Sequence, residues 1–265
     1  MLIDSHCHLD YLDIPTVEGG LSGALARSRA AGVRAIVVPA VGPENFQRVQ
    51  DLAQREPDVF YALGIHPMYV DDLGDDALVT LENALDRCRH DPKLVAVGEI
   101  GLDHYVPGLD REKMERFYSA QCRLARDFDL PVILHVRKAQ DRVLKFLRQF
   151  GIRHGIAHAF NGSRVQADAF IAQGMALGFG GAMTFTRAAQ IRRLAIELPI
   201  ESIVLETDSP DIAPAWKEKG EANEPAEILA IARCLAQLRG LSIETLSAQS
   251  ESNVMRALPR LSRPA

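Results

Sequence analysis

Residues 131–135 read Pro-Val-Ile-Leu-His, an apolar run that ends on a histidine. The run lies between two longer stretches, 110–128 and 139–150, in which the pattern of apolar residues is helical. A strand that is apolar at every position is typical of a parallel sheet whose two faces are both covered. The segment therefore predicts a helix–strand–helix piece of an α/β fold.

The same alternation of short apolar runs and amphipathic stretches occurs eight times along the chain. The predicted strands are Leu2–Ser5, Ala35–Pro39, Phe60–Gly64, Leu94–Glu99, Pro131–His135, Gly155–His158, Ala176–Gly178 and Ile203–Glu206. The predicted helices span 20–31, 44–55, 76–90, 110–128, 139–150, 164–173, 188–198, 225–240 and 243–258. Eight such units in about 260 residues match the usual size of a (β/α)8 or TIM barrel.

An open, doubly wound sheet is the competing architecture, because it is built from the same βαβ units. That fold usually carries a glycine-rich dinucleotide fingerprint after its first strand, and this chain has none there. No low-complexity tract or Pro/Gly linker divides the chain. We therefore expect one barrel domain over residues 1–265.

Composition indicates an ordinary globular protein, with 47% hydrophobic and 25% charged residues. The four cysteines are scattered, which argues against a disulfide framework and fits a reducing compartment. Neither a targeting segment nor an apolar run long enough to span a bilayer is visible. We expect a cytoplasmic protein that is not bound to a membrane and needs no obligate protein partner.

The net charge of −5 limits how the chain could bind nucleic acid. Proteins that coat duplex DNA are normally basic on at least one face. If this protein binds DNA, a local pocket must do so.

Candidate chemistry begins at His6-Cys7-His8, directly after the first predicted strand. Residues two apart in a strand point to the same side, so both imidazoles face one way. Two imidazoles make half of a metal site, but an H-x-H pair alone is weak evidence.

Other predicted strands end in the same kind of residue. His135, His158 and Glu99 end their strands, and Asp208 follows the last one in Leu-Glu-Thr-Asp. In a βα barrel these ends meet at one rim, where active sites are built. Each residue could singly be an exposed strand end, but six at one rim predict a shared site. The set is His6, His8, Glu99, His135, His158 and Asp208.

The types of these six side chains indicate which metals would bind. Imidazoles and carboxylates without thiolates suit Zn²⁺, Mn²⁺, Co²⁺ or Ni²⁺, and Mg²⁺ less well. A single open catalytic ion uses about three protein ligands. Two divalent ions that share a carboxylate account better for six, and such pairs suit displacement at phosphorus.

Six motifs together resemble the TatD family of metal-dependent deoxyribonucleases. They are His6-Cys-His8, Gly-Ile-His66-Pro, Gly-Glu99-Ile-Gly-Leu-Asp103, Leu-Pro-Val-Ile-Leu-His135, His158-Ala-Phe-Asn-Gly-Ser163 and Glu-Thr-Asp208-Ser-Pro. Their order and spacing match from Ile3 to Asn253. The resemblance implies a TIM barrel of the amidohydrolase superfamily that cleaves phosphodiesters, typically of DNA from the 3′ end.

The resemblance also implies roles for individual residues. His6, His8 and Asp208 would bind one metal, and His135 and His158 the other. Glu99 would bridge the two, and Asp208 would also take the proton from the attacking water.

The chain departs from the family pattern at two places. The family usually has Ser-Arg-Asp after the fifth-strand histidine, whereas this chain has Val136-Arg137-Lys138. Arg137 is retained and is a candidate phosphate contact, with an exposed helix start as its other interpretation. Ala222 stands where the family often has an arginine, which removes one potential phosphate contact.

Three further residues could each have one of two roles. Ser163 is either a helix N-cap or part of a phosphate-binding helix terminus. His66 either contacts substrate or turns the loop before Pro67, and we favour substrate. Asp103 either orients a metal ligand or begins the next loop.

Three functions remain open from the sequence. The leading one is a phosphodiesterase that acts on DNA ends, which Arg137, Lys138 and the family resemblance favour. A second is a hydrolase of a small amide, lactone or phosphoester on the same metal platform, since the fold supports both chemistries. The third is a non-catalytic binding barrel, which a complete set of metal ligands argues against.

Overall fold

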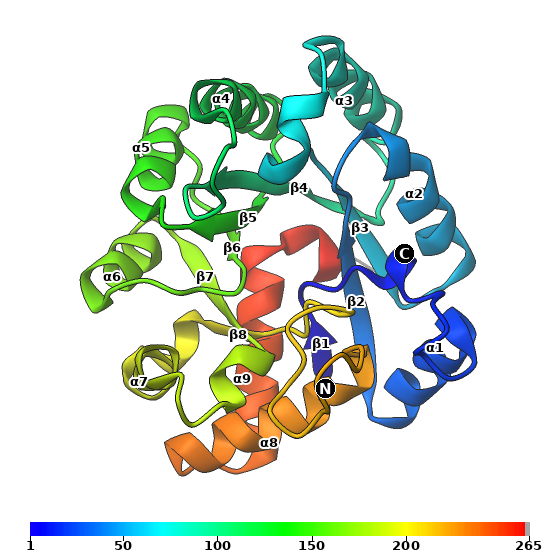
Figure 1. Ribbon diagram of the computed structural model, residues 1–265, viewed down its shortest axis with the longest axis vertical. Helices are drawn as coiled ribbons and strands as arrows, with labels where there is room; N and C mark the ends of the chain where they lie inside the picture. The colour runs from blue at the N-terminus through cyan, green and yellow to red at the C-terminus, as the bar shows by residue number, and fades with distance from the viewer. Residues whose placement is uncertain (263–265) are drawn as a thin grey trace.

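A computed structural model describes residues 1–262. Its eight strands form one parallel sheet in chain order, and helices surround the sheet (Figure 1). The strands are β1 (Leu2–Asp4), β2 (Val33–Pro39), β3 (Val59–Leu63), β4 (Leu94–Asp103), β5 (Val132–Arg137), β6 (Gly155–Ala157), β7 (Met175–Phe179) and β8 (Ile203–Leu205). The amide of Ser5, just past β1, donates to the carbonyl of Leu205 in β8 at 3.1 Å, which joins the first strand to the last. The predicted TIM barrel is confirmed.

The helices also follow the sequence pattern closely. They are α1 (Gly20–Ala30), α2 (Phe46–Arg55), α3 (Asp76–Arg87), α4 (Arg111–Asp127), α5 (Gln140–Phe150), α6 (Arg164–Ala172), α7 (Ala189–Glu197), α8 (Ile228–Arg239) and α9 (Ile243–Ala257). Short 3-10 turns lie in several loops, among them η3 (Pro67–Asp72) and η7 (Pro259–Ser262). None of the helices in the described part of the chain has the length and apolarity to cross a membrane.

Two strands continue beyond the residues at which we expected them to end. Glu99 lies inside β4, which runs on to Asp103, and His135 lies inside β5, which runs on to Arg137. The extensions pair with each other, with Asp103 opposite Arg137, so the ladder continues past the expected rim. The register of β4 is irregular between Val97 and Ile100, and such a bulge re-aims side chains locally. Glu99 sits within it.

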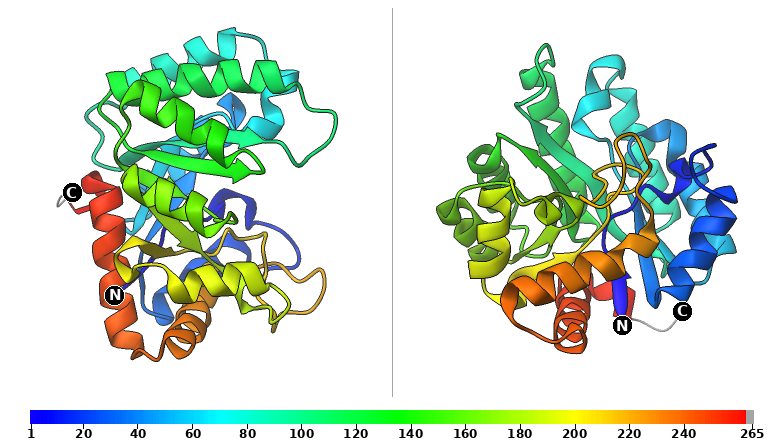
Figure 2. Two further views of the ribbon diagram at one scale, coloured as in Figure 1. Left: turned by 90° about the vertical axis from the view of Figure 1, so that its left-hand side faces the viewer. Right: turned by 60° about the horizontal axis from the view of Figure 1, so that its bottom comes forward.

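The barrel interior is apolar at the end where the strands begin. Alternate strand residues such as Ile133, Ile156 and Val204 point inward and form their own buried cluster. Side chains of α9 and η7, including Leu258 and Leu261, join this cluster and close the end at which the strands begin. Figure 2 (left) shows α9 on the side of the barrel opposite the long loops. A second, larger cluster fills the space between the strands and the outer helices.

Candidate metal centre

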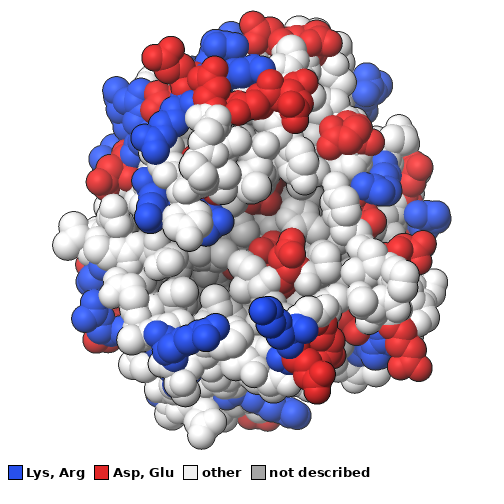
Figure 3. All heavy atoms as spheres, viewed as in Figure 1, with Lys and Arg blue, Asp and Glu red and all other residues white. Residues whose placement is uncertain are grey.

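A cavity of about 820 Å³ opens at the end of the barrel where the strands finish. Figure 3 shows it as a hollow, with acidic atoms inside it and basic atoms at its margin. Histidines and carboxylates that lie in or just after six of the strands line it, together with the side chains of Tyr11, Met68, Tyr69 and Tyr105. The candidate residues from the sequence therefore meet at one site, as their positions at strand ends predict.

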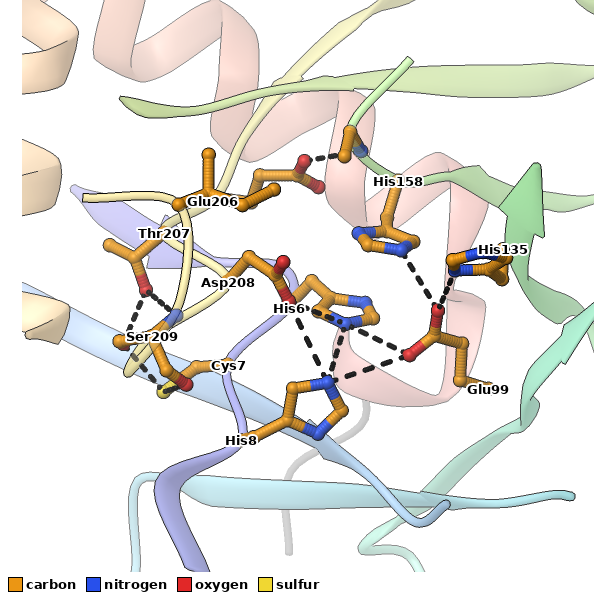
Figure 4. Close-up of polar contacts among 12 residues, drawn as sticks. His6, Cys7, His8, Glu99, His135, His158, Glu206, Thr207, Asp208 and Ser209 are labelled. Atoms are coloured by element: carbon orange, nitrogen blue, oxygen red, sulfur yellow. Dashed lines mark hydrogen bonds and ion pairs between the residues drawn. The ribbon is translucent and has the colours of Figure 1, made fainter. Parts of the chain in front are cut away.

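Four atoms lie close together, from Glu99 in β4 and from residues that follow β1 and β8, and we call them the first donor group (Figure 4). They are Nε2 of His6, Nε2 of His8, Oε2 of Glu99 and Oδ1 of Asp208. From His6 Nε2 the other three atoms lie at 3.3, 3.3 and 3.2 Å in that order. From His8 Nε2, Glu99 Oε2 lies at 3.5 Å and Asp208 Oδ1 at 3.6 Å.

The other carboxylate oxygen of Glu99 faces a second donor group, formed with His66, His135 and His158. Glu99 Oε1 lies 2.8 Å from His158 Nε2, 3.0 Å from His135 Nδ1 and 3.3 Å from His66 Nε2. His66 Nε2 and His135 Nδ1 are 3.1 Å apart. Glu99 thus directs one oxygen to each donor group.

The spacing of these atoms fits a divalent cation. Bonds of 2.0–2.2 Å to nitrogen and oxygen place tetrahedral ligand atoms about 3.3–3.6 Å apart. Five of the distances within the first donor group fall between 3.2 and 3.6 Å. Those in the second donor group are slightly shorter, at 2.8 to 3.3 Å. Nitrogen and carboxylate donors without a thiolate suit Zn²⁺, Mn²⁺, Co²⁺ or Ni²⁺.

The carboxylates of the centre are held in their charged form. Burial raises the pKa of Glu99, but its interactions with the imidazoles of His158, His66 and His6 lower it well below its ordinary value. Burial also raises the pKa of Asp208, yet hydrogen bonding to His6 and the nearby histidine charges bring it below its usual range. Two ionised carboxylates among imidazoles give the donor set a negative charge that a cation would balance.

The histidines of the centre are shifted in opposite directions. Burial lowers the pKa of His6, but Glu99 and Asp208 outweigh it and raise the pKa well above its ordinary value. Burial lowers the pKa of His158 to about 4, and the charge of His6 adds to that effect. His158 is therefore neutral near pH 7, the form in which imidazole binds metals.

Asp208 is positioned by hydrogen bonds to the residue before it. Thr207 donates from its amide and its hydroxyl to the two oxygens of buried Asp4, at 2.9 and 2.6 Å. Asn223 Nδ2 donates to the Thr207 carbonyl at 2.7 Å. Asp208 itself has a positive φ of 56°, a conformation that aspartate adopts more readily than most residues. These bonds fix the backbone that carries the carboxylate.

Asp103 orients His135, one of the two readings from the sequence. Its Oδ2 accepts a hydrogen bond from His135 Nε2 at 3.0 Å, and this bond leaves Nδ1 of His135 directed at Glu99. Asp103 Oδ1 accepts from the amides of Tyr105 and Val106, at 2.7 and 2.9 Å. A carboxylate behind a ligating histidine fixes its tautomer and ring orientation.

The three residues that we expected to contact substrate, His66, Arg137 and Ser163, lie in different surroundings in the structure. His66 lines the cavity, as a substrate contact would, and its Nε2 also belongs to the second donor group. Arg137 lines the cavity and is half exposed. Ser163 is the N-cap of α6, where its hydroxyl accepts from the amide of Gln166 in a capping box. It is not among the residues that line the cavity.

Glu206 is a buried carboxyl group that our sequence reasoning missed. Its Oε1 accepts a hydrogen bond from the amide of Ala159, next to His158, at 2.5 Å. Burial raises its pKa to about 8. A Cβ atom at Gly178 would lie 2.0 Å from Glu206 Oε2, so this glycine leaves the space that the carboxyl fills. The signal was available, because Glu206 directly follows the apolar residues of β8, two positions before Asp208 in Leu-Glu-Thr-Asp.

Comparisons with known proteins agree with this site. A family model described as TatD related DNase matches residues 3–259. The metal-dependent hydrolase YjjV of Escherichia coli K12 is 39% identical over 238 residues, which cover 89% of this chain and 90% of YjjV. TATDN3 of Mus musculus, whose name proposes a deoxyribonuclease, is 33% identical over 98% of this chain and 89% of its own length.

The fold is also shared with solved structures. The crystal structure of YjjV superposes with a TM-score of 0.90 at 36% sequence identity, covering 97% of this chain and 98% of YjjV. A TatD family hydrolase from Entamoeba histolytica superposes with a TM-score of 0.82 over 97% of each chain. Its 21% identity makes that a likeness of fold alone.

Proposed function

The chain belongs to the TatD family of metal-dependent hydrolases, and we propose that it cleaves phosphodiester bonds of DNA with a pair of divalent metal ions. One observation carries this proposal: Glu99 directs its two carboxylate oxygens to two separate donor groups. A carboxylate so placed can bridge two ions, and a two-ion clamp suits in-line displacement at phosphorus.

The proposed ligands follow the two donor groups. His6, His8 and Asp208 would hold one ion, and His135 and His158 the other, with Glu99 between them. His66 is an additional candidate for the second ion, because its Nε2 lies 3.3 Å from Glu99 Oε1. When bound, the ions would supply an acidified water molecule and polarise the phosphoryl group.

Protein side chains would perform the proton transfer and hold the substrate. Asp208 is ionised and lines the cavity, so it can accept the proton of the attacking water. Asp103 keeps His135 in one tautomer and orientation. Arg137 at the cavity wall can donate two parallel hydrogen bonds to a phosphate, which lysine at the same place could not.

The first test uses end-labelled DNA. Metal-loaded protein is incubated with single strands labelled at the 5′ or the 3′ end, and the products are separated by length. We expect metal-dependent shortening that a chelator stops and added Mn²⁺ or Zn²⁺ restores. A 3′–5′ exonuclease would release the 3′ label first as a mononucleotide. Intact strands under all these conditions would contradict the proposal.

A small uncharged or singly charged substrate is the second candidate. It is favoured by the net charge of −5 and by Asp211, a further carboxylate at the cavity wall. The same protein is therefore assayed on a panel of small amides, lactones and phosphoesters. Turnover of one of these at rates far above those on DNA would support this alternative.

A further inference from the structure

Tyr105, Arg137 and Lys138 form a cluster at the mouth of the cavity, which we call the rim clamp. The guanidinium carbon of Arg137 lies 4.2 Å from the centroid of the Tyr105 ring, and Lys138 Nζ lies 4.8 Å from it. Building on the proposed phosphodiesterase function, we propose that the rim clamp is a second phosphate subsite. It holds the phosphate that neighbours the scissile one, so the preferred substrate carries at least two phosphates.

The rim clamp lies one layer above the metal centre. Ile133, His135 and Arg137 alternate along β5 and so point to the same inner face. Ile133 belongs to the apolar interior and His135 to the second donor group, which makes Arg137 the third layer. Two residues of strand rise about 6.6 Å, comparable to one phosphate-to-phosphate step in an extended strand. A phosphate at the metal centre therefore leaves room for the next at the rim clamp.

The cations of the rim clamp are available to a ligand. Arg137 has one ionic contact among residues 1–262, a distant one of 4.0 Å from its Nη1 to Asp103 Oδ2. Within residues 1–262 the Lys138 side chain has no hydrogen bond or ion pair, and its ammonium group lies over the Tyr105 ring. Their donors thus face the cavity mouth without a protein acceptor. A cation over an aromatic face is restrained without losing its hydrogen-bonding capacity.

Tyr105 is a positioning residue in this proposal, because it acts through the two cations. Its own backbone is fixed by Asp103, which accepts a hydrogen bond from its amide at 2.7 Å. Asp103 also accepts from His135 Nε2, so one carboxylate anchors both the metal centre and the rim clamp. The clamp is therefore held at a defined position relative to the metal centre, as two sites for consecutive phosphates require.

The distribution of charged side chains around the cavity indicates along which side a bound substrate extends away from the metal centre. The arginine and lysine that line the cavity, Arg137 and Lys138, lie at the end of β5, whereas the carboxylate of Asp211 lies after β8. A chain of phosphates is attracted to the first side and repelled by the second. The substrate should therefore leave the metal centre over the strands β4 and β5.

Matched dinucleotides test the second subsite. The thymidine dinucleotide with one internal phosphodiester is compared with the same compound carrying an added 5′- or 3′-phosphate. For one of the two, wild-type kcat/KM should rise about tenfold or more, the scale of one charged hydrogen bond. The measured quantity is the ratio of kcat/KM with the added phosphate to kcat/KM without it. Lys138→Met and Arg137→Ala should each reduce this ratio, and together bring it close to one. Lys145→Met, the same change at an exposed position of α5 outside the cavity, should leave the ratio as in wild type.

Substitutions of Tyr105 separate positioning from a general structural effect. Tyr105→Leu should lower the ratio, whereas Tyr105→Phe, which retains the ring, should preserve it. Equal losses in both variants would overturn the role of the ring. A wild-type ratio near one for both added phosphates would overturn the second subsite itself.

Binding separates this inference from the proposed function. The affinities of the three dinucleotides are measured by calorimetry in Mn²⁺, whether or not the compounds are cleaved. If no dinucleotide is cleaved but the added phosphate strengthens binding through Lys138, the subsite stands and the phosphodiesterase proposal fails. If the dinucleotides are cleaved but the added phosphate changes neither rate nor affinity, the phosphodiesterase proposal stands and the second subsite fails.

Discussion

The two ends of the barrel are built from the same strands but in opposite ways. At the closed end, inward residues such as Ile133 and Val204 pack against Leu258 and Leu261 from the C-terminal segment. At the open end, two residues further along the same strands, His135 and Glu206 are buried among other polar groups. The strand periodicity of two therefore places an apolar layer directly beneath a polar one.

The difference shows how stability and chemistry are divided along the barrel axis. Burying apolar side chains stabilises the fold, while burying ionisable ones costs free energy unless they are paired. The closed end holds the eight strands in place, so that the open end can bring carboxylates and imidazoles within 2.8 to 3.6 Å of one another. Substitutions at the two ends should consequently have separable effects.

The largest effect is expected at Glu99, whose two carboxylate oxygens face the two donor groups. Glu99→Gln keeps the shape but removes the charge that both groups share. We expect the metal content to fall and the rate to drop by about a thousandfold, the upper range for losing one electrostatic group in an active site. Metal analysis and steady-state kinetics measure the two effects. A variant with normal metal content and turnover would show that Glu99 is not shared.

Asp208 should matter to turnover more than to binding. Asp208→Asn keeps an oxygen donor but cannot accept a proton, so kcat should fall about 100-fold or more while metal and DNA affinity persist in part. Thermal unfolding should stay close to that of the wild type, because the Thr207 and Asn223 bonds remain. Turnover near the wild-type rate would remove Asp208 from the proton transfer.

Substitutions at the closed end should lower stability and leave turnover unchanged. Leu258 is fully buried between α9 and η7, and Leu258→Ala should lower the free energy of unfolding by about 2–5 kcal/mol. The kcat of the folded fraction should not change. Val165→Ala, at a side chain that is 78% exposed, is the matched control and should change stability by less than about 0.5 kcal/mol. Loss of metal affinity in the Leu258 variant would show that the two ends are coupled.

A smaller effect is expected at a surface ion pair. Hydrogen bonds from Arg29 lower the pKa of Asp58 below its ordinary value of 3.8. The pair therefore stabilises the folded state above pH 3.8 and loses that contribution as the pH falls through the lowered pKa. Asp58→Asn should cost less than about 1 kcal/mol at pH 7, because the Arg29 side chain is 42% exposed to solvent. Urea unfolding of both proteins at pH 7 and pH 3 should show a difference that shrinks in acid.

The fold could be predicted almost completely, because it depends on patterns within short segments. Apolar runs such as 131–135 and the Gly and Pro residues after the helices place every strand and helix of the barrel. The extension of β4 to Asp103 was missed, since it depends on pairing with β5 and on the irregular register before Ile100. Such pairing between segments leaves little trace in either sequence alone.

The site could be predicted as a set of residues but not as a geometry. Strand ends and the family resemblance brought together the six proposed ligands, and the structure places them around one carboxylate. They did not place His66 inside the second donor group, because its loop turns inward only in the folded chain. Nor did they identify Asp4, whose partner Thr207 is 203 residues away.

The number of metal ions per chain tests the central claim, that Glu99 joins two ion sites, most directly. Purified protein is stripped of metal, titrated with Mn²⁺ or Zn²⁺, and freed of unbound ions before its metal content and its phosphodiesterase rate are measured. The account predicts two bound ions per chain, with most of the activity appearing as the second one binds. Full activity with a single ion per chain, and no further binding, would contradict it.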